Sequence, residues 1–125
     1  WGIASSFCRS NSVHGGVAIL VKKDLISRCD PIPSIAAMSK EKHCELCALY
    51  CAAYSMVIIS LYRSPLGDFD IFVNTLTSVL QSLDPNTEVI LAGDFNVHFN
   101  TQERDAVYVT NLLATFGLVK TSEDP

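Results

Sequence analysis

The chain has 125 residues, of which 49% are hydrophobic and 18% are charged, and its formal net charge at pH 7 is -4. This size and composition suit one globular domain, or a large part of one, because such a chain closes a single core. The acidic balance excludes a protein that coats nucleic acid through a broad basic surface. The acidic charge does not exclude an enzyme that binds a few phosphates at a small site.

The two ends of the chain and its cysteines indicate its context. The first residue is Trp1, and no basic segment leads into an apolar one there, so we expect a piece of a longer polypeptide without a secretion signal. The cysteines are odd in number and lack the spacing of a disulfide scaffold, which predicts reduced thiols in an intracellular protein. They are Cys8, Cys29, Cys44, Cys47 and Cys51.

The first half of the chain predicts three strands. "HGGVAILVKKDL" (14–25) is a glycine turn followed by an apolar, β-branched run, and "DPIPS" (30–34) predicts a loop because it holds two prolines. The segment from Leu46 to Tyr62 carries no charge, but it is at the short limit for a membrane-spanning helix and is interrupted at Tyr54. Two adjacent strands, 44–51 and 56–62, explain it better.

The second half alternates helices with strands. Asp68 is a suitable N-cap for a helix whose apolar residues recur every three or four positions from Phe69 to Leu83. "EVILAG" predicts the next strand, 102–116 predicts a second helix with Gly117 as its C-cap, and "LVKT" (118–121) is expected to begin another strand. The order predicts an α/β (α+β) fold with a mixed sheet and packed helices.

Polar side chains cluster where the strand at 88–92 ends, in "GDFNVHF". Gly93 allows a sharp turn, and in an extended chain Asp94 and Asn96 would point the same way, with Phe95 turned toward the core. A carboxylate can orient or deprotonate a water, and an amide can donate to a phosphate oxygen. The alternative is a simple turn toward the next helix, for which Asp and Asn are common.

A second polar strand end lies in "SLYRSP" (60–65). Tyr62 could contact a phosphate through its hydroxyl and Arg63 through its guanidinium, although an ordinary strand terminus before a proline is the alternative. Because active sites of open α/β sheets gather where strand ends converge, the two ends together favour a site.

The segments "GGVAILVK", "SLYRSP" and "ILAGDFNVHF", in this order, resemble the endonuclease/exonuclease/phosphatase superfamily. They are most similar to the apurinic-type endonuclease domain of non-LTR retrotransposons. The resemblance implies a partial four-layer α/β sandwich of the DNase I-like type, with residues 1–125 as the central portion of one domain. It implies a DNA-nicking phosphodiesterase that uses Mg²⁺ (or Mn²⁺), works in the nucleus and is covalently linked to a reverse transcriptase.

The resemblance also implies roles for individual residues. Asp94 would orient or activate the attacking water, Asn96 would position that water and the scissile phosphate, and Tyr62 would contact the phosphate. Arg63 and His98 are weaker candidates for substrate binding, and His14 is weaker still.

Two parts of the family's site have no counterpart in this chain. The family's metal-binding glutamate would lie before Trp1, and its Ser-Asp-His motif would follow Pro125, whereas Glu45 and the histidines His14, His43 and His98 do not match those places. We therefore expect no metal ligand here and an inactive or nearly inactive isolated chain.

Three other interpretations stay open. A zinc module is suggested by "HCELCALYC" (43–51), although Cys44 and Cys47 would face opposite sides of a strand and no second Cys/His pair follows. A non-catalytic scaffold or binding domain with a degenerate site would have much the same sequence. Another phosphatase of the superfamily, acting on a phospholipid or RNA, would use the same Asp94 and Asn96.

Overall fold

The computed structural model describes residues 1–121 and divides the chain into two compact units. The first unit is Trp1–Phe95 and the second is Asn96–Pro125.

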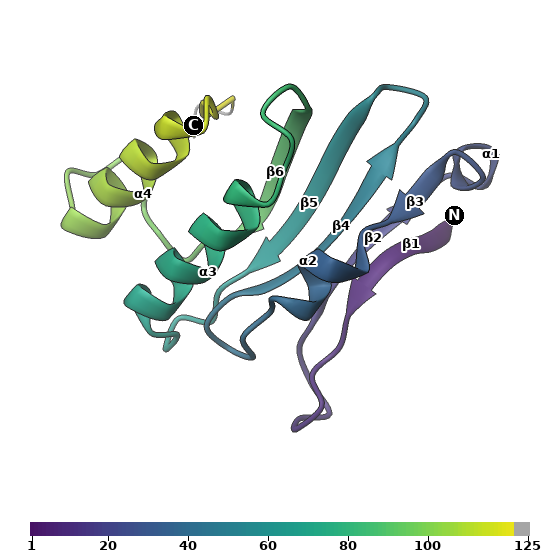
Figure 1. The fold of residues 1–125 in the computed structure, drawn as a ribbon. Coiled ribbons are helices and arrows are strands. Elements are labelled where there is room, and N and C mark those ends of the chain that lie inside the picture. Colours follow the sequence, from purple (N-terminus) through teal and green to yellow (C-terminus); the bar gives the residue numbers. More distant parts are fainter. Residues whose placement is uncertain (122–125) are drawn as a thin grey trace. The chain divides into compact units, whose positions relative to one another are not determined.

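The centre of the first unit is a four-stranded sheet with the order β3-β4-β5-β6 (Figure 1). The strands are β3 (Cys29–Pro31), β4 (Glu45–Cys51), β5 (Met56–Tyr62) and β6 (Glu88–Asp94). β3 and β5 both run antiparallel to β4, whereas β6 runs parallel to β5. The predicted mixed sheet is therefore confirmed, and so are the strands expected at 44–51, 56–62 and 88–92.

The parallel pair needs a crossover, which is the helix α3 (Phe69–Gln81). Asp68 caps this helix as predicted, because its side chain accepts a hydrogen bond from the backbone N–H of Ile71 at 2.9 Å. Leu83 lies beyond the end of the helix. The face of α3 that is turned to the core is apolar apart from one threonine, with Phe72, Val73, Thr75, Leu76, Val79 and Leu80 buried.

A second, two-stranded sheet packs against the other face of the main sheet, over β3, β4 and β5 (Figure 1). Its strands are β1 (Gly2–Phe7) and β2 (Val17–Val21), which pair antiparallel. The side chains between the two sheets form an apolar cluster of Cys29, Leu49 and Cys51 with Ala4, Ile19, Val21, Met56 and Ile58. With α2 and α3 on the opposite face, the first unit has a helix layer and two sheet layers. The mixed α/β class is confirmed, while the four-layer DNase I-like architecture stays a prediction.

The sequence misled in two places of the N-terminal half. The proline segment 30–34, expected to be loop, contributes the edge strand β3 and the start of helix α2 (Pro33–Ala37). Pro31 is tolerated because β3 is at the sheet edge, and Pro33 because the first turn of a helix needs no N–H donor. Strand β1 was missed because its serines break the apolar alternation. The apolar run expected within 14–25 is confirmed as strand β2, and the short helix α1 (Lys23–Ile26) follows it.

The second unit contains the helix α4 (Arg104–Thr115), as predicted. Gly117 follows it in the left-handed conformation, with φ 75°, and the N–H of Leu118 bonds to the carbonyl of Leu113 at 3.0 Å. This hydrogen bond and the left-handed glycine form a Schellman motif, a common C-terminal cap of helices. The strand expected at 118–121 is therefore wrong, because Leu118 closes the helix instead.

The uncharged segment forms the β4–β5 hairpin, and its turn places Ser55 at φ 51°. Among residues 1–121, every helix is too short or too polar to cross a bilayer.

Burial predicts unequal reactivity of the thiols. Cys44 is completely buried, which raises the pKa of its thiol from 9.0 to about 12, whereas Cys8 is exposed. We expect iodoacetamide at pH 8 to alkylate Cys8 in the native protein and Cys44 only after unfolding, as read by mass spectrometry of the peptides. Because the folded pKa is the higher one, the stability contributed by this thiol is complete below pH 9 and is lost between pH 9 and 12. Equal alkylation rates for the two cysteines would contradict the fold.

Candidate active site

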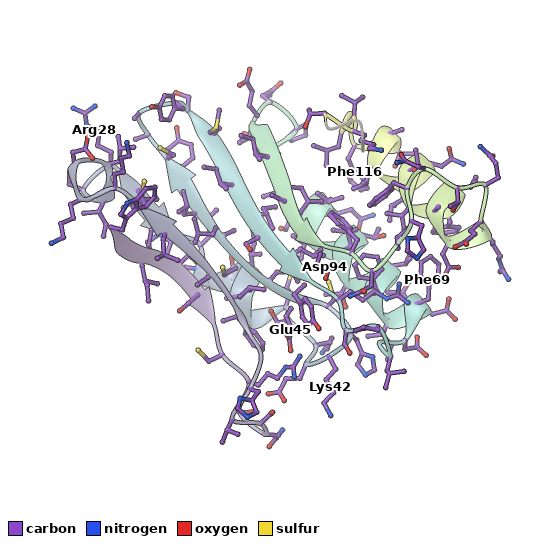
Figure 2. All side chains as sticks on the ribbon, turned by 180° about the vertical axis from the view of Figure 1, so that it is seen from behind. Arg28, Lys42, Glu45, Phe69, Asp94 and Phe116 are labelled. Atoms are coloured by element: carbon purple, nitrogen blue, oxygen red, sulfur yellow. The ribbon has the colours of Figure 1, made fainter. Side chains whose placement is uncertain are left out.

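Three polar side chains lie in one row across the end of the main sheet. Tyr62, the last residue of β5, is paired in register with Glu45 at the start of β4 and with Asp94 at the end of β6. Residues opposite each other in neighbouring strands point to the same face, so these side chains share a face. Figure 2 shows Glu45 and Asp94 toward the same end of the sheet, with Arg28 toward the opposite end. We call these three residues the polar row.

The polar row lies on the face of the main sheet that the β1–β2 sheet covers. Met56 and Ile58 of β5 pack in the cluster between the two sheets. Because side chains alternate along a strand, Tyr62 belongs to the same face as these two residues. The row therefore lies where the β1–β2 sheet ends, on the side opposite to α3.

Gly93 allows β6, which carries Asp94, to lie close to β5, which carries Tyr62. A Cβ atom at Gly93 would lie 1.8 Å from the carbonyl oxygen of Leu61, and the residue has φ 148°. Beyond this contact the ladder continues, because the N–H of Arg63 donates to the carbonyl of Asp94 at 2.9 Å. The glycine of the Gly-Asp-Phe-Asn segment thus serves strand pairing and not only the turn that follows.

The members of the polar row differ in their access to solvent. Asp94 is exposed, Tyr62 is half-buried and Glu45 is fully buried. The Glu45 carboxylate accepts hydrogen bonds from the side chain of Arg9 and, at 3.0 Å, from the backbone N–H of Lys42. The hydrogen bond from Arg9 to this carboxylate is the largest cause that raises the pKa of Arg9, and the charges of Glu45 and Tyr62 are smaller contributors.

The sequence did not predict that Glu45 lies in the polar row or that Arg9 pairs with it. One signal was available: Glu45 is the charge that borders the long uncharged run, and a charge at the first residue of a buried strand needs a partner. The partner, 36 residues earlier in the chain, is given only by the fold.

Phe95 turns back into the core, as predicted. Its ring meets the ring of Phe72 of α3 edge-on, with 6.3 Å between the ring centroids. Asp94 is therefore followed at once by an anchored aromatic residue, which holds the end of β6.

Asn96 and His98 belong to the second unit. Asn96 has φ 48°, a left-handed conformation that asparagine adopts more readily than most residues. The expectation that Asp94 and Asn96 point the same way assumed an extended chain, and this assumption is wrong at Asn96. The carbonyl of His98 accepts hydrogen bonds from the N–H and the hydroxyl of Thr101, at 3.0 and 2.8 Å, in the turn that leads to α4.

The side chains of Tyr62 and Arg63 lie on opposite sides of the main sheet, so the structure does not bring their polar groups together. The guanidinium of Arg63 is buried on the α3 side, 5.3 Å from the ring centroids of both Phe69 and Phe72, and donates to the carbonyl of Gly67 at 3.1 Å. Its charge therefore lies within the packing of α3, and a contact with phosphate stays a prediction. His14 is exposed, and its carbonyl accepts a hydrogen bond from Arg9 at 3.2 Å.

The carboxylates here do not by themselves make a metal site. Residues 1–121 contain no group of three His, Cys, Asp or Glu side chains that could hold an ion. Asp94 has the oxygen chemistry that Mg²⁺ prefers, but Glu45 is occupied by Arg9, so this donor set is too small to fit the ion.

The fold and the polar row define an α/β domain in which polar side chains gather at the converging ends of neighbouring strands, as in many hydrolases. The family model described as endonuclease-reverse transcriptase matches residues 56–122, which is more than half of the chain. The chain belongs to this family and is an endonuclease/exonuclease/phosphatase-type domain of retrotransposon origin. Comparisons with curated proteins and with solved structures gave no match.

Substituting Gly93 tests the close approach of β6 to β5. We expect Gly93→Ala to destabilise the protein by about 3 kcal/mol or more, because the new methyl group meets the Leu61 carbonyl and the backbone must shift. Gly117→Ala is the matched control: it also has positive φ but has nothing within 4 Å of the added atom, so it should cost only about 1 kcal/mol. Urea unfolding measures both, and equal losses would contradict the strand pairing.

Proposed function

We propose that this chain contributes one side of a DNA-nicking site that hydrolyses a phosphodiester. The proposal is carried by the register of β4, β5 and β6, which sets Asp94 beside Tyr62 at one end of the sheet. It is supported by the match to the endonuclease-reverse transcriptase family, which includes Tyr62, Asp94 and Asn96.

Each of these residues would have one task in the reaction. The exposed carboxylate of Asp94 orients the attacking water and takes one of its protons. The hydroxyl of Tyr62 donates a hydrogen bond to a non-bridging phosphate oxygen, where negative charge grows in the transition state. The amide of Asn96 positions the water and the phosphate.

The bond changes balance without any further reactant. The water oxygen forms a bond to phosphorus while one P–O ester bond breaks. Asp94 passes the proton it took from the water to solvent, and the leaving alkoxide takes a proton from solvent water. The products are a phosphomonoester and an alcohol, so the strand is nicked.

We further propose that the reaction uses Mg²⁺ or Mn²⁺, which would stabilise charge on the phosphate when bound. Residues 1–121 supply too few ligands for such an ion, and no step above depends on it. The chain also holds neither the glutamate nor the Ser-Asp-His motif that the family resemblance implies. We therefore expect it to be inactive or nearly so by itself, and active as part of a full-length polypeptide that also carries a reverse transcriptase and acts in the nucleus.

The role of Asp94 is tested in a plasmid-nicking assay with Mg²⁺ on the full-length polypeptide. We expect Asp94→Asn to lower the nicking rate about a thousandfold, because the amide cannot accept the water's proton. Glu88→Gln is the matched control, since Glu88 is an exposed carboxylate on the same face of β6 at the other end of the strand. A full-length protein that does not nick DNA, or an Asp94→Asn variant that nicks at the original rate, would refute the proposal.

The role of Tyr62 is tested by removing only its hydroxyl. We expect Tyr62→Phe to lower kcat about tenfold to a hundredfold with little change in thermal stability, because the lost donor stabilises the transition state. Tyr50→Phe, on β4 and on the opposite face of the sheet, should leave kcat unchanged. Equal effects of the two substitutions would show that Tyr62 does not act on the phosphate.

A further inference from the structure

A largely buried ion pair joins Glu45 of the polar row to Arg9. The carboxylate of Glu45 is fully buried, and the side chain of Arg9 is 11% exposed. Nε of Arg9 donates to Oε1 of Glu45, and Nη2 donates to Oε2 at 3.3 Å, so the contact is bidentate. Nη1 donates to the carbonyl of His14 at 3.2 Å. Each of the three guanidinium nitrogens therefore has an acceptor within the protein.

The ion pair joins two connections of the chain at the Tyr62 end of the sheet. Arg9 lies in the connection between β1 and β2 (residues 8–16), while Glu45 follows the segment 40–44. The N–H of Lys42 donates to Glu45 at 3.0 Å, and the carbonyl of Lys42 accepts from the N–H of Ser64 at 2.9 Å. The backbone around Tyr62 is thus fixed at two points, by the pairing of Tyr62 with Glu45 and by the hydrogen bond from Ser64 to Lys42. Figure 2 shows Lys42 and Glu45 at the same end of the sheet.

The glycine pair that precedes β2 makes room for this arrangement. A Cβ atom at Gly15 would lie 2.3 Å from Cζ of Arg9, and one at Gly16 would lie 2.4 Å from the carbonyl oxygen of Phe7. Both glycines have positive φ, 104° and 113°. The "HGG" segment therefore shapes the connection so that it can receive the guanidinium.

Stability alone does not explain a buried ion pair. Taking two charges out of water costs free energy, and replacing such a pair by apolar side chains of similar volume is often neutral or stabilising. A bidentate pair does fix geometry, because its two hydrogen bonds set both the distance and the orientation of the groups.

We propose that Arg9 and Glu45 are positioning residues that hold Tyr62 in the orientation needed to meet the phosphate. This inference rests on the proposed function. The pair fastens the segment 8–16 to Glu45, the cross-strand partner of Tyr62, so that the Tyr62 hydroxyl is presented at the end of the row beside Asp94. Since positioning acts on the transition state more than on DNA binding, its loss lowers kcat and leaves KM nearly unchanged.

The test is a double substitution that removes both charges, Arg9→Met with Glu45→Leu, in the full-length polypeptide. Apolar replacement of both partners should keep the protein folded, whereas removing one charge would leave the other buried and unpaired. We expect kcat for nicking to fall about tenfold or more, with KM for the plasmid within about twofold of the original. Glu41→Gln is the matched control, because the bonds of Glu41 to Ser10 join the same two connections at an exposed place. It should change neither constant.

A second measurement reads the position of Tyr62 without any activity. In protein labelled with 3-fluorotyrosine, the ¹⁹F resonance of Tyr62 is assigned as the one lost in Tyr62→Phe. The double substitution should shift or broaden this resonance and leave that of exposed Tyr54 in place. An unchanged Tyr62 resonance would overturn the inference whatever the nicking data show.

The two measurements separate this inference from the proposed function. A shifted Tyr62 resonance together with an unchanged kcat would overturn the positioning role while leaving the nicking site intact. If the unsubstituted full-length protein does not nick DNA, the proposed function fails, and the catalytic purpose of the pair fails with it. A shifted resonance with a lower kcat and an unchanged KM supports both.

Discussion

The close parallel pairing of β5 with β6 is the constraint on which the rest of this domain depends. Leu61 and Gly93 approach so closely that no side chain fits at position 93, and this contact places Tyr62 opposite Asp94. The β4–β5 hairpin then adds Glu45 to the same row. Three residues separated by up to 49 positions in the chain are therefore brought to one end of one sheet by backbone register alone.

The two faces of the main sheet carry different charged groups. On one face, α3 packs its apolar side against the sheet, and the guanidinium of Arg63 lies near two phenylalanine rings of this helix. On the other face, the connection between β1 and β2 delivers Arg9 to Glu45. Adjacent residues Tyr62 and Arg63 thus have different surroundings, because side chains alternate between the faces of a strand. The phenol belongs to the polar row, and the guanidinium belongs to the packing of the helix.

Local patterns predicted well where the structure is decided locally. The apolar period and the Asp68 cap located α3, and the uncharged run located the β4–β5 hairpin. Patterns failed where tertiary context decides: Pro31 sits in a strand because that strand is at the sheet edge, and β1 is a strand although serines interrupt it. Their motifs singled out Asp94 and Tyr62 as candidates, but the link between Glu45 and Arg9 could not be predicted, because it depends on how distant segments pack.

The central claim is that Asp94 and Tyr62 act together on one phosphate, and a double-substitution cycle on the nicking rate of the full-length polypeptide tests it most directly. The cycle compares Asp94→Asn, Tyr62→Phe and the two combined under single-turnover conditions. Groups that act as a unit give strongly non-additive losses, so the combined variant should be little slower than Asp94→Asn alone. Losses that simply multiply would mean that the two side chains act independently and would contradict the account.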